Sequence, residues 1–431
     1  MRKTVLYRSL APVVLALSSG SVSAAGFQLL EQNASGLGNA YAGSAAVAEN
    51  ASTVFYNPAG MIRLAAREAS VGLSLIRPSF KFKDQGSSAG ALTGGSSDAG
   101  SWAALPNAYF TWALNDDLRL GLGIGAPFGL MTDYQRNWLG SAHSIEFDIK
   151  TVNLNPALAW RVNEQLSLGF GLNWQRMDAE YLRRAGTMNL PPAAGSLPLA
   201  STLVKLKADD DSWGWNAGVL LQLSDATRLG LSYRSKIKHQ LRGDLKASGP
   251  VTAFNAAVSS KAGATVELPD TFILSLAHAL DSRWELLADV SWTGWSSIKR
   301  VDIKRRSGAL AGQTAQVLDT DFRDSWRLAL GANYRLDPAW KLKFGLAHDQ
   351  TPVKNARKRL TSLPDNDRLW FSFGAQWQPA AGNTLDLGVA YLYVRDTSIN
   401  AGDAADPQRG LVKGEYDSSV WIVGAQYSLA F

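Results

Sequence analysis

The feature that most constrains this chain is a two-residue alternation of apolar and polar side chains. It recurs in "LRLGLGIGA" at residues 118–126, in "SWRLALGANYRL" at 325–336 and in "WKLKFGLAH" at 340–348. Successive side chains of a β-strand point to opposite faces, so this period predicts strands with one apolar and one polar face. Alternation alone fits a soluble sandwich as well as a membrane barrel.

Connections of two different lengths favour the barrel. Short polar turns begin at Asn115, Asn163, Ser224, Asp281 and Asp337, and a sixth lies near Gly382. Other connections, such as 184–211 and 305–322, are expected to be long loops. Short turns at one end and long loops at the other are typical of bacterial outer-membrane barrels.

The polar faces of several predicted strands carry full charges. Arg327, Arg335, Lys341 and Lys343 alternate with large apolar residues. A soluble core buries charge only at high cost, whereas a water-filled lumen accommodates it. We therefore interpret the chain as all-β, a 14-stranded antiparallel transmembrane barrel. The predicted strands are 67–82, 104–115, 118–134, 144–163, 166–183, 210–224, 227–248, 265–280, 283–305, 322–337, 340–351, 360–379, 383–400 and 410–431.

Three domains are expected along the chain. Residues 1–24 have a basic start, a short apolar core and the small residues "SVSA", which predict a secretory signal peptide. Residues 25–66 are rich in small residues and turns, including "TVFYNPAGM", and show no sustained period. An open barrel of this size leaves an empty lumen, so we predict that 25–66 form a hatch inside it. Residues 67–431 are the barrel.

Composition excludes several other classes of function. The net charge of +6 includes three residues of the predicted signal peptide, so the mature chain is nearly neutral and no nucleic-acid partner is expected. The chain has no cysteine, and its four histidines are scattered without a zinc-binding motif. We expect no metal, no cofactor and no enzymatic activity, with a barrel hydrolase as the weakest alternative.

Several blocks resemble one known family. "AGFQLLEQNASGLGNAYAGSAAVAENASTVFYNPAGM", "GIGAPFGLMTDY", "ELPDTFILSLAHAL", "WTGWSSI", "LPDNDRLWFSFGAQW" and "VWIVGAQYSLAF" are similar, in order and spacing, to blocks of the FadL family. That family transports long-chain fatty acids and other hydrophobic compounds across the outer membrane of Gram-negative bacteria. The resemblance covers essentially the whole mature chain.

The resemblance implies capture at the outer loops, transfer to an internal pocket and passive exit sideways through a gap in the wall. It places the hatch motif on Asn57, Pro58 and Ala59, beside that gap. It places the gap itself at the third-strand kink, on Pro127, Phe128 and Gly129. The residue types at this position support the same expectation. Pro127 has no backbone N–H to donate to a neighbouring strand and Gly129 relaxes the backbone, so strand pairing is expected to fail there.

For the ligand pocket, the resemblance implies Arg183 near a ligand carboxylate and Phe27 as a lining aromatic. A second basic position of the family falls on Leu318, with Arg323 nearby but at a different position. This departure keeps open the uptake of aromatic or alkane hydrocarbons, and a general porin is a further alternative. The expected partners are a hydrophobic small molecule, outer-membrane lipid and the barrel assembly machinery, with the protein as a monomer.

Overall fold

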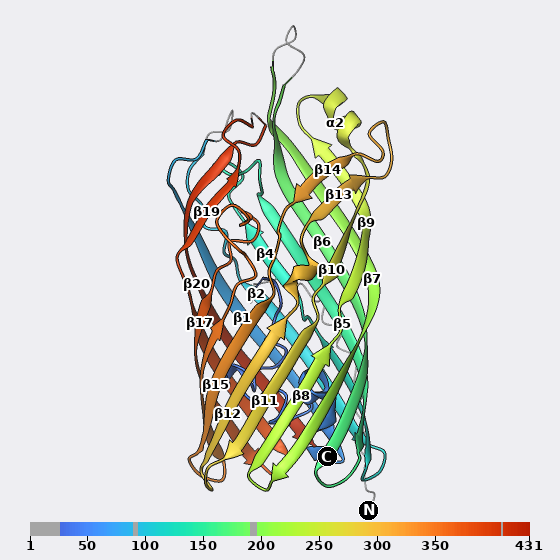
Figure 1. The fold of residues 1–431 in the computed structure, drawn as a ribbon, viewed down its shortest axis with the longest axis vertical. Coiled ribbons are helices and arrows are strands. Elements are labelled where there is room, and N and C mark those ends of the chain that lie inside the picture. The colour runs from blue at the N-terminus through green and yellow to red at the C-terminus, as the bar shows by residue number, and fades with distance from the viewer. Residues whose placement is uncertain (1–25, 89–93, 190–195, 407) are drawn as a thin grey trace, which may run out of the picture.

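A computed structural model describes residues 26–88, 94–189, 196–406 and 408–431. The predicted signal peptide, 1–24, lies outside this part of the chain. The strand segments form one closed antiparallel sheet (Figure 1). They combine into the 14-stranded barrel that the sequence predicts. Among the described residues, no helix is long and apolar enough to span a membrane.

The strands follow one another around the wall. Their bounds are β1 Arg67–Asp84, β2 Ala103–Ala113, β3 Leu118–Gly125, β4 Gly129–Asp133, β5 Glu146–Arg161, β6 Leu166–Asn189, β7 Ser196–Ser224, β8 Thr227–Arg234, β9 Ile237–Ser248, β10 Ser260–Leu268, β11 Thr271–Ala279, β12 Trp284–Thr293, β13 Val301–Arg305, β14 Thr314–Leu318, β15 Ser325–Arg335, β16 Trp340–Asp349, β17 Arg368–Ala380, β18 Asn383–Val394, β19 Thr397–Gly402 and β20 Leu411–Ala430. The helices are η1 Leu37–Asn39, α1 Thr53–Tyr56, η2 Pro58–Arg63, α2 Thr252–Val258 and η3 Trp295–Ser297.

The first and last strands close the barrel. β1 pairs with β20 from Glu68 opposite Ala430 to Asp84 opposite Gly414. Several spans are interrupted on the way: β3 and β4 both pair with β5, and β8 and β9 both pair with β7. These interruptions explain why there are more strand segments than spans.

One predicted loop is wrong. The segment 184–211 is not an irregular connection, because β6 and β7 stay paired through most of it, with Arg183 opposite Val204 and Arg176 opposite Asp211. The alternation continues there, since Val204 and Leu206 are buried while Lys207 is exposed. The expected strand at 360–379 also begins later, at Arg368.

The outer face of the wall is apolar over the lower barrel. Leu330, Leu346, Val423 and Trp421 are exposed, which suits contact with the lipid hydrocarbon of a membrane. Stacked aromatics such as Trp340 and Trp377, with ring centroids 6.0 Å apart, lie towards the short turns. The barrel therefore presents a lipid-facing band.

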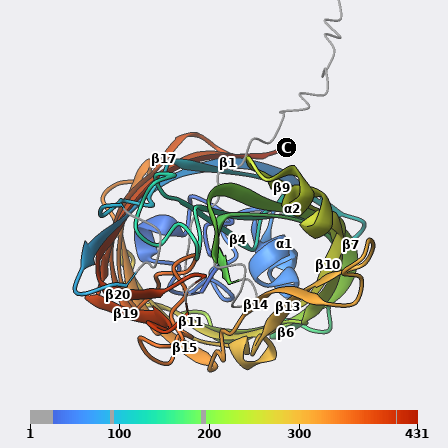
Figure 2. The same ribbon diagram turned by 90° about the horizontal axis from the view of Figure 1, so that it is seen from above.

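The N-terminal segment, residues 26–66 of the described chain, is the hatch. It lies inside the ring of strands, where Figure 2 shows it in blue around α1. Residues from Leu29 to Met61 are largely buried. Wall glycines allow close approach of the two backbones: a Cβ on Gly345 would lie 2.1 Å from the carbonyl carbon of Asn39.

The charged inner faces of the wall do not meet open water at this level. Lys343 is 1% exposed in its side chain and pairs with Asp386 at 2.9 Å and with Glu49 of the hatch. Arg327 is buried and donates to the carbonyl of Ala40. The prediction of a wet lumen is wrong for Lys343 and Arg327, because the hatch fills the lumen there and contacts both side chains, whereas Arg335 is exposed.

Candidate functional site

An apolar cavity of about 70 Å³ lies inside the barrel, on the loop side of the hatch. Its walls come from β4 to β7, β9, β10, β13 and β14, together with the loop before β17. The lining includes Phe27, Leu130, Phe147, Ile149, Tyr181, Leu206, Leu241, Val266, Ile298, Val301, Ile303, Leu318, Phe322, Leu360 and Leu363. Such a lining removes an apolar ligand from water, which stabilises it by about 0.8 kcal/mol per buried CH₂.

Aromatic side chains close the hatch end of the cavity. The ring of Phe27 lies 4.9 Å from that of Trp295 and 6.0 Å from that of Phe128, in edge-on arrangements. Trp295 is fully buried because η3 interrupts the span between β12 and β13 and turns this side chain inward. The predicted pocket residue Phe27 therefore does line the cavity.

The wall beside the cavity is not fully paired. β2 pairs with β3 only as far as Ala108 opposite Ile124, and its residues 103–107 pair with β1 alone. β4, on the far side of the kink, pairs with β5. Pro106, which has no amide hydrogen to donate, lies in this one-sided stretch. The break includes the predicted residues Pro127, Phe128 and Gly129.

The free edge of the kink is hydrogen-bonded to the hatch. The amide of Leu29 donates to the carbonyl of Pro127 at 2.8 Å, and that of Gly129 donates to the carbonyl of Phe27 at 2.9 Å. The side-chain amide of Gln32 also donates to the carbonyl of Ala126 at 2.8 Å. The start of the hatch thus acts as a short extra strand at the break.

A basic cluster lies just beyond the cavity, towards the loops. Arg183 follows the lining residue Tyr181 on the same face of β6 and is buried. Arg305 of β13 and Arg409 lie near enough to repel its charge. Arg183 Nη1 donates to the carbonyl of Arg184 at 2.8 Å. No carboxylate of the described residues lies within 4.0 Å of Arg183.

Other polar groups lie between the cavity and this cluster. Gln316 of β14 donates to the hydroxyl of Tyr181 at 3.4 Å, while its own Oε1 is buried without a partner among the described residues. The hydroxyl of Tyr181 donates to the carbonyl of His143, in the loop between β4 and β5. Burial, together with the charges of Arg409 and Arg183, lowers the pKa of His143 to about 4. The acidic residue of the cavity lining, Glu180, is paired with Lys205 at 2.7 Å and with Lys207.

The structure places the hatch motif against β6 and β7. Asn57 donates to the carbonyls of Ala45 at 2.7 Å and Val219 of β7 at 3.0 Å, and accepts from the amide of Ala59. Pro58 and Ala59 lie against Gly169 of β6. These contacts fasten the hatch to β6 and β7, whereas the kink is contacted by Phe27 and Leu29.

Two arginines of this region, Arg305 and Arg409, were not singled out from the sequence. Leu318 lines the cavity, so the second charge beside Arg183 comes from Arg305 and Arg409 instead. Arg323 donates to the carbonyl of Thr351 at 3.2 Å. Arg305 lies two residues after Ile303, so the alternation of the strand places both on the inner face. This alternation was the only feature of the sequence that could have indicated Arg305 as a residue of the site. Within the described residues, no cluster of three or more His, Asp or Glu side chains could hold a metal ion.

These features define a class: a transmembrane β-barrel that is blocked by an internal hatch and holds an apolar cavity beside a break in its wall. The chain belongs to the family of outer membrane transport proteins described as OMPP1/FadL/TodX, which matches residues 15–431. Membership confirms the resemblance seen in the sequence and places the protein in the outer membrane. Members of this family are transport channels rather than enzymes.

Relatives and solved structures agree. The long-chain fatty acid transport protein of Escherichia coli O6:H1 is 30% identical over 457 residues, covering 100% of both chains. Outer membrane protein P1 of Haemophilus influenzae is 33% identical over 418 residues, covering 89% of each. The crystal structure of a Pseudomonas aeruginosa FadL homologue superimposes with a TM-score of 0.85 at 25% identity, over 94% of this chain and 100% of that one. The Ralstonia pickettii toluene transporter TbuX shares the fold, with a TM-score of 0.66 at 16% identity over 94% of this chain and 100% of that one.

Proposed function

We propose that this protein takes up long-chain fatty acids passively across the outer membrane. The observation that carries the proposal is the apolar cavity next to Arg183, a buried arginine with no carboxylate partner among the described residues. A buried charge without a counter-ion is costly, so the site favours a ligand that brings its own negative charge. A fatty acid joins such a charge to a long apolar tail.

The two parts of the ligand match the two parts of the site. The tail gains about 0.8 kcal/mol per CH₂ on leaving water for the cavity. An arginine side chain binds a carboxylate through two parallel, charge-assisted hydrogen bonds. Arg305 and Arg409 add positive charge to the same region. They replace the second basic residue of the family pattern, whose position is taken here by Leu318. The name of the Escherichia coli relative supports the same ligand class.

The proposed exit is sideways, through the one-sided stretch of β2 opposite the kink. The cavity has no room for a long chain while Phe27 and Trp295 pack together at its end. Ligand entry therefore displaces Phe27, and Phe27 is hydrogen-bonded to Gly129. Movement of this segment uncovers the break, and the apolar ligand passes into the membrane without crossing a water-filled lumen.

Uptake of neutral aromatic or alkane hydrocarbons is the second candidate. The observation in its favour is Leu318, an apolar residue in the cavity wall where the family pattern has a second basic residue. A general porin is disfavoured because the hatch occupies the lumen. Assembly by the barrel assembly machinery and a monomeric state stay predictions.

The test is an uptake assay in an outer-membrane strain that lacks its own hydrophobic-compound transporters. Cells that express the protein should take up oleate faster than the empty strain, and gain little for toluene or an alkane of the same length. Faster uptake of the neutral compounds alone would favour the second candidate. A large ion conductance of the intact protein in planar bilayers would favour the porin.

A further inference from the structure

A basic hollow of about 500 Å³ lies on the outside of the barrel, where β9, β10 and β13 rise above the lipid-facing band. The cavity side of these strands carries Leu241, Val266 and Ile303, so their alternate residues point outward. The outward lining of the hollow includes Gly263, Thr265, Arg300, Asp302, Lys304 and Arg306.

Strand register brings three cations around one glycine. Gly263 of β10 pairs with Arg242 of β9 on one side and with Lys304 of β13 on the other. Adjacent strands are about 4.8 Å apart, so Arg242 and Lys304 flank the side-chain-free position at a separation of roughly 10 Å. Arg306 covers this position, since a Cβ on Gly263 would lie 3.2 Å from Arg306 Cδ.

The acidic residues of this face are already engaged. Asp302 pairs with Arg300 at 2.6 Å, Asp244 with Lys261 at 2.8 Å, and Glu267 with Lys236 at 3.6 Å. Within the described residues, Arg242, Lys304 and Arg306 have no acidic side chain within 4.0 Å. Asp209, opposite Arg242 on β7, is itself paired with Arg176 at 3.0 Å. A bound anion would therefore offset the repulsion among these three cations.

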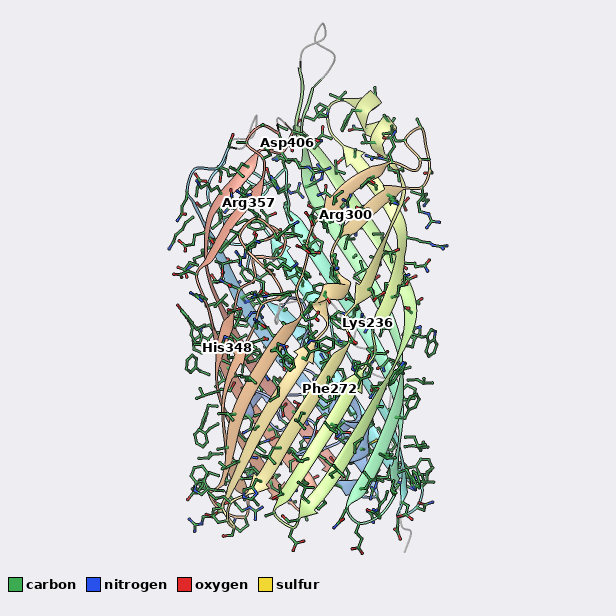
Figure 3. The ribbon with its side chains drawn as sticks, viewed as in Figure 1. Lys236, Phe272, Arg300, His348, Arg357 and Asp406 are labelled. Atoms are coloured by element: carbon green, nitrogen blue, oxygen red, sulfur yellow. The ribbon has the colours of Figure 1, made fainter. Side chains whose placement is uncertain are left out.

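The hollow lies at the level of lipid head groups. Just below it on the same wall are Tyr233, Phe272 and Trp292, which face outward; such aromatics mark the membrane interface. Figure 3 places Phe272 below Lys236, and Lys236 below Arg300. The loop side of an outer-membrane barrel faces the outer leaflet, whose glycolipid carries phosphate groups on its sugar head.

We propose that Arg242, Lys304 and Arg306 bind the phosphate groups of an outer-leaflet glycolipid. Arginine and lysine are the common partners of phosphate, arginine through two parallel hydrogen bonds. The acyl chains of the same lipid lie along the apolar face below. The contact holds a lipid against the outer face of β9, β10 and β13, whose inner face lines the cavity. The lipid site is therefore separate from the transport route.

The proposal is tested with protein refolded in detergent free of lipopolysaccharide. Native mass spectrometry would measure binding of diphosphorylated lipid A, of monophosphorylated lipid A and of inorganic phosphate. We expect the triple variant Arg242→Ala/Lys304→Ala/Arg306→Ala to bind diphosphorylated lipid A at least tenfold more weakly. The single variants Lys304→Ala and Arg306→Ala should each weaken it about threefold, which keeps the test open if the triple variant does not fold.

The matched control replaces three outward-facing lysines on the β1 and β20 wall: Lys81→Ala/Lys83→Ala/Lys413→Ala. It should retain the affinity of the unaltered protein for lipid A. Equal affinity of all variants would overturn the proposal. Competition by inorganic phosphate at the same concentration as lipid A would assign the hollow to free anions and overturn the glycolipid. Oleate uptake should be unchanged in every variant, so failure here leaves the proposed transport function standing.

Discussion

The backbone amide of Gly129 donates a hydrogen bond of 2.9 Å to the carbonyl oxygen of Phe27. One residue belongs to the kink in the wall and the other to the cavity lining. A ligand that moves the backbone of Phe27 would break this hydrogen bond. The proposed lateral route therefore predicts that occupancy of the cavity is linked to opening of the break.

Removal of the kink tests this link. Deleting residues 127–129 joins β3 to β4 without the inward turn, so we expect a continuous wall next to β2. Oleate uptake should fall to the level of the empty strain, while heat-modifiable migration in gels shows that the barrel still assembles. Deleting residues 309–311, in the exposed connection between β13 and β14, is the control and should preserve uptake. Normal uptake by the kink deletion would remove the lateral route.

The strands were predictable because a two-residue period is a local property. The interruption at Pro127 and Gly129 was also predictable, because proline and glycine signal it locally. The other interruptions were not, because they depend on contacts across the barrel. Trp295 comes just after β12, a strand of the wall. Its side chain is nevertheless turned inward and is fully buried against Phe27. No local pattern distinguishes it from the interface tryptophans of the outer wall.

Residues of the site were predictable only in part, for the same reason. The resemblance indicated Phe27 and Arg183, and both lie at or next to the cavity. Arg305 and Gln316 come from other strands, and only closure of the barrel brings them near Arg183 and Tyr181. The charges of Lys343 and Arg327 were read correctly as facing inward, but their partners in the hatch could not be inferred from the strand alone.

Ion pairs between the hatch and β16 should hold the lumen shut. Glu49 pairs with Lys341 at 3.0 Å and with the buried Lys343. Losing a charge-assisted contact costs roughly 1.5–3 kcal/mol, so Glu49→Gln should produce more frequent ion-conducting openings in planar bilayers. Deleting residues 25–66 should give a larger, steady conductance.

The control for this experiment is an exposed pair. Asp321→Asn breaks the contact with Lys354, where both side chains are well exposed; such pairs contribute about 0–1 kcal/mol. Its conductance should equal that of the unaltered protein. If Glu49→Gln stays equally closed, the hatch is held by its apolar and backbone contacts alone.

Acid should loosen the outer loop that carries His143. Burial lowers the pKa of this residue from 6.5 to about 4. Between these values the unfolded loop binds a proton that the folded loop does not, so stability falls as pH drops from about 6.5 towards 4. The protection of the amide hydrogens in residues 138–145, which is their exchange rate relative to the intrinsic rate at the same pH, should therefore fall over this range. His143→Gln should remove that pH dependence; an identical profile in the variant would assign it to other groups.

The charge of Arg183 should decide which ligands the cavity prefers. If a carboxylate binds there, Arg183→Ala removes a charge-assisted contact of roughly 1.5–3 kcal/mol, which weakens oleate binding about ten- to a hundredfold. Binding of a neutral alkane or toluene should barely change, because the apolar lining stays intact. The neighbouring Arg184, which lies on the opposite face of β6 and donates to the carbonyl of Arg136 at 2.9 Å, provides the control variant Arg184→Ala. Equal losses for charged and neutral ligands would show that Arg183 supports the fold of the site, and no loss for either would place the carboxylate elsewhere.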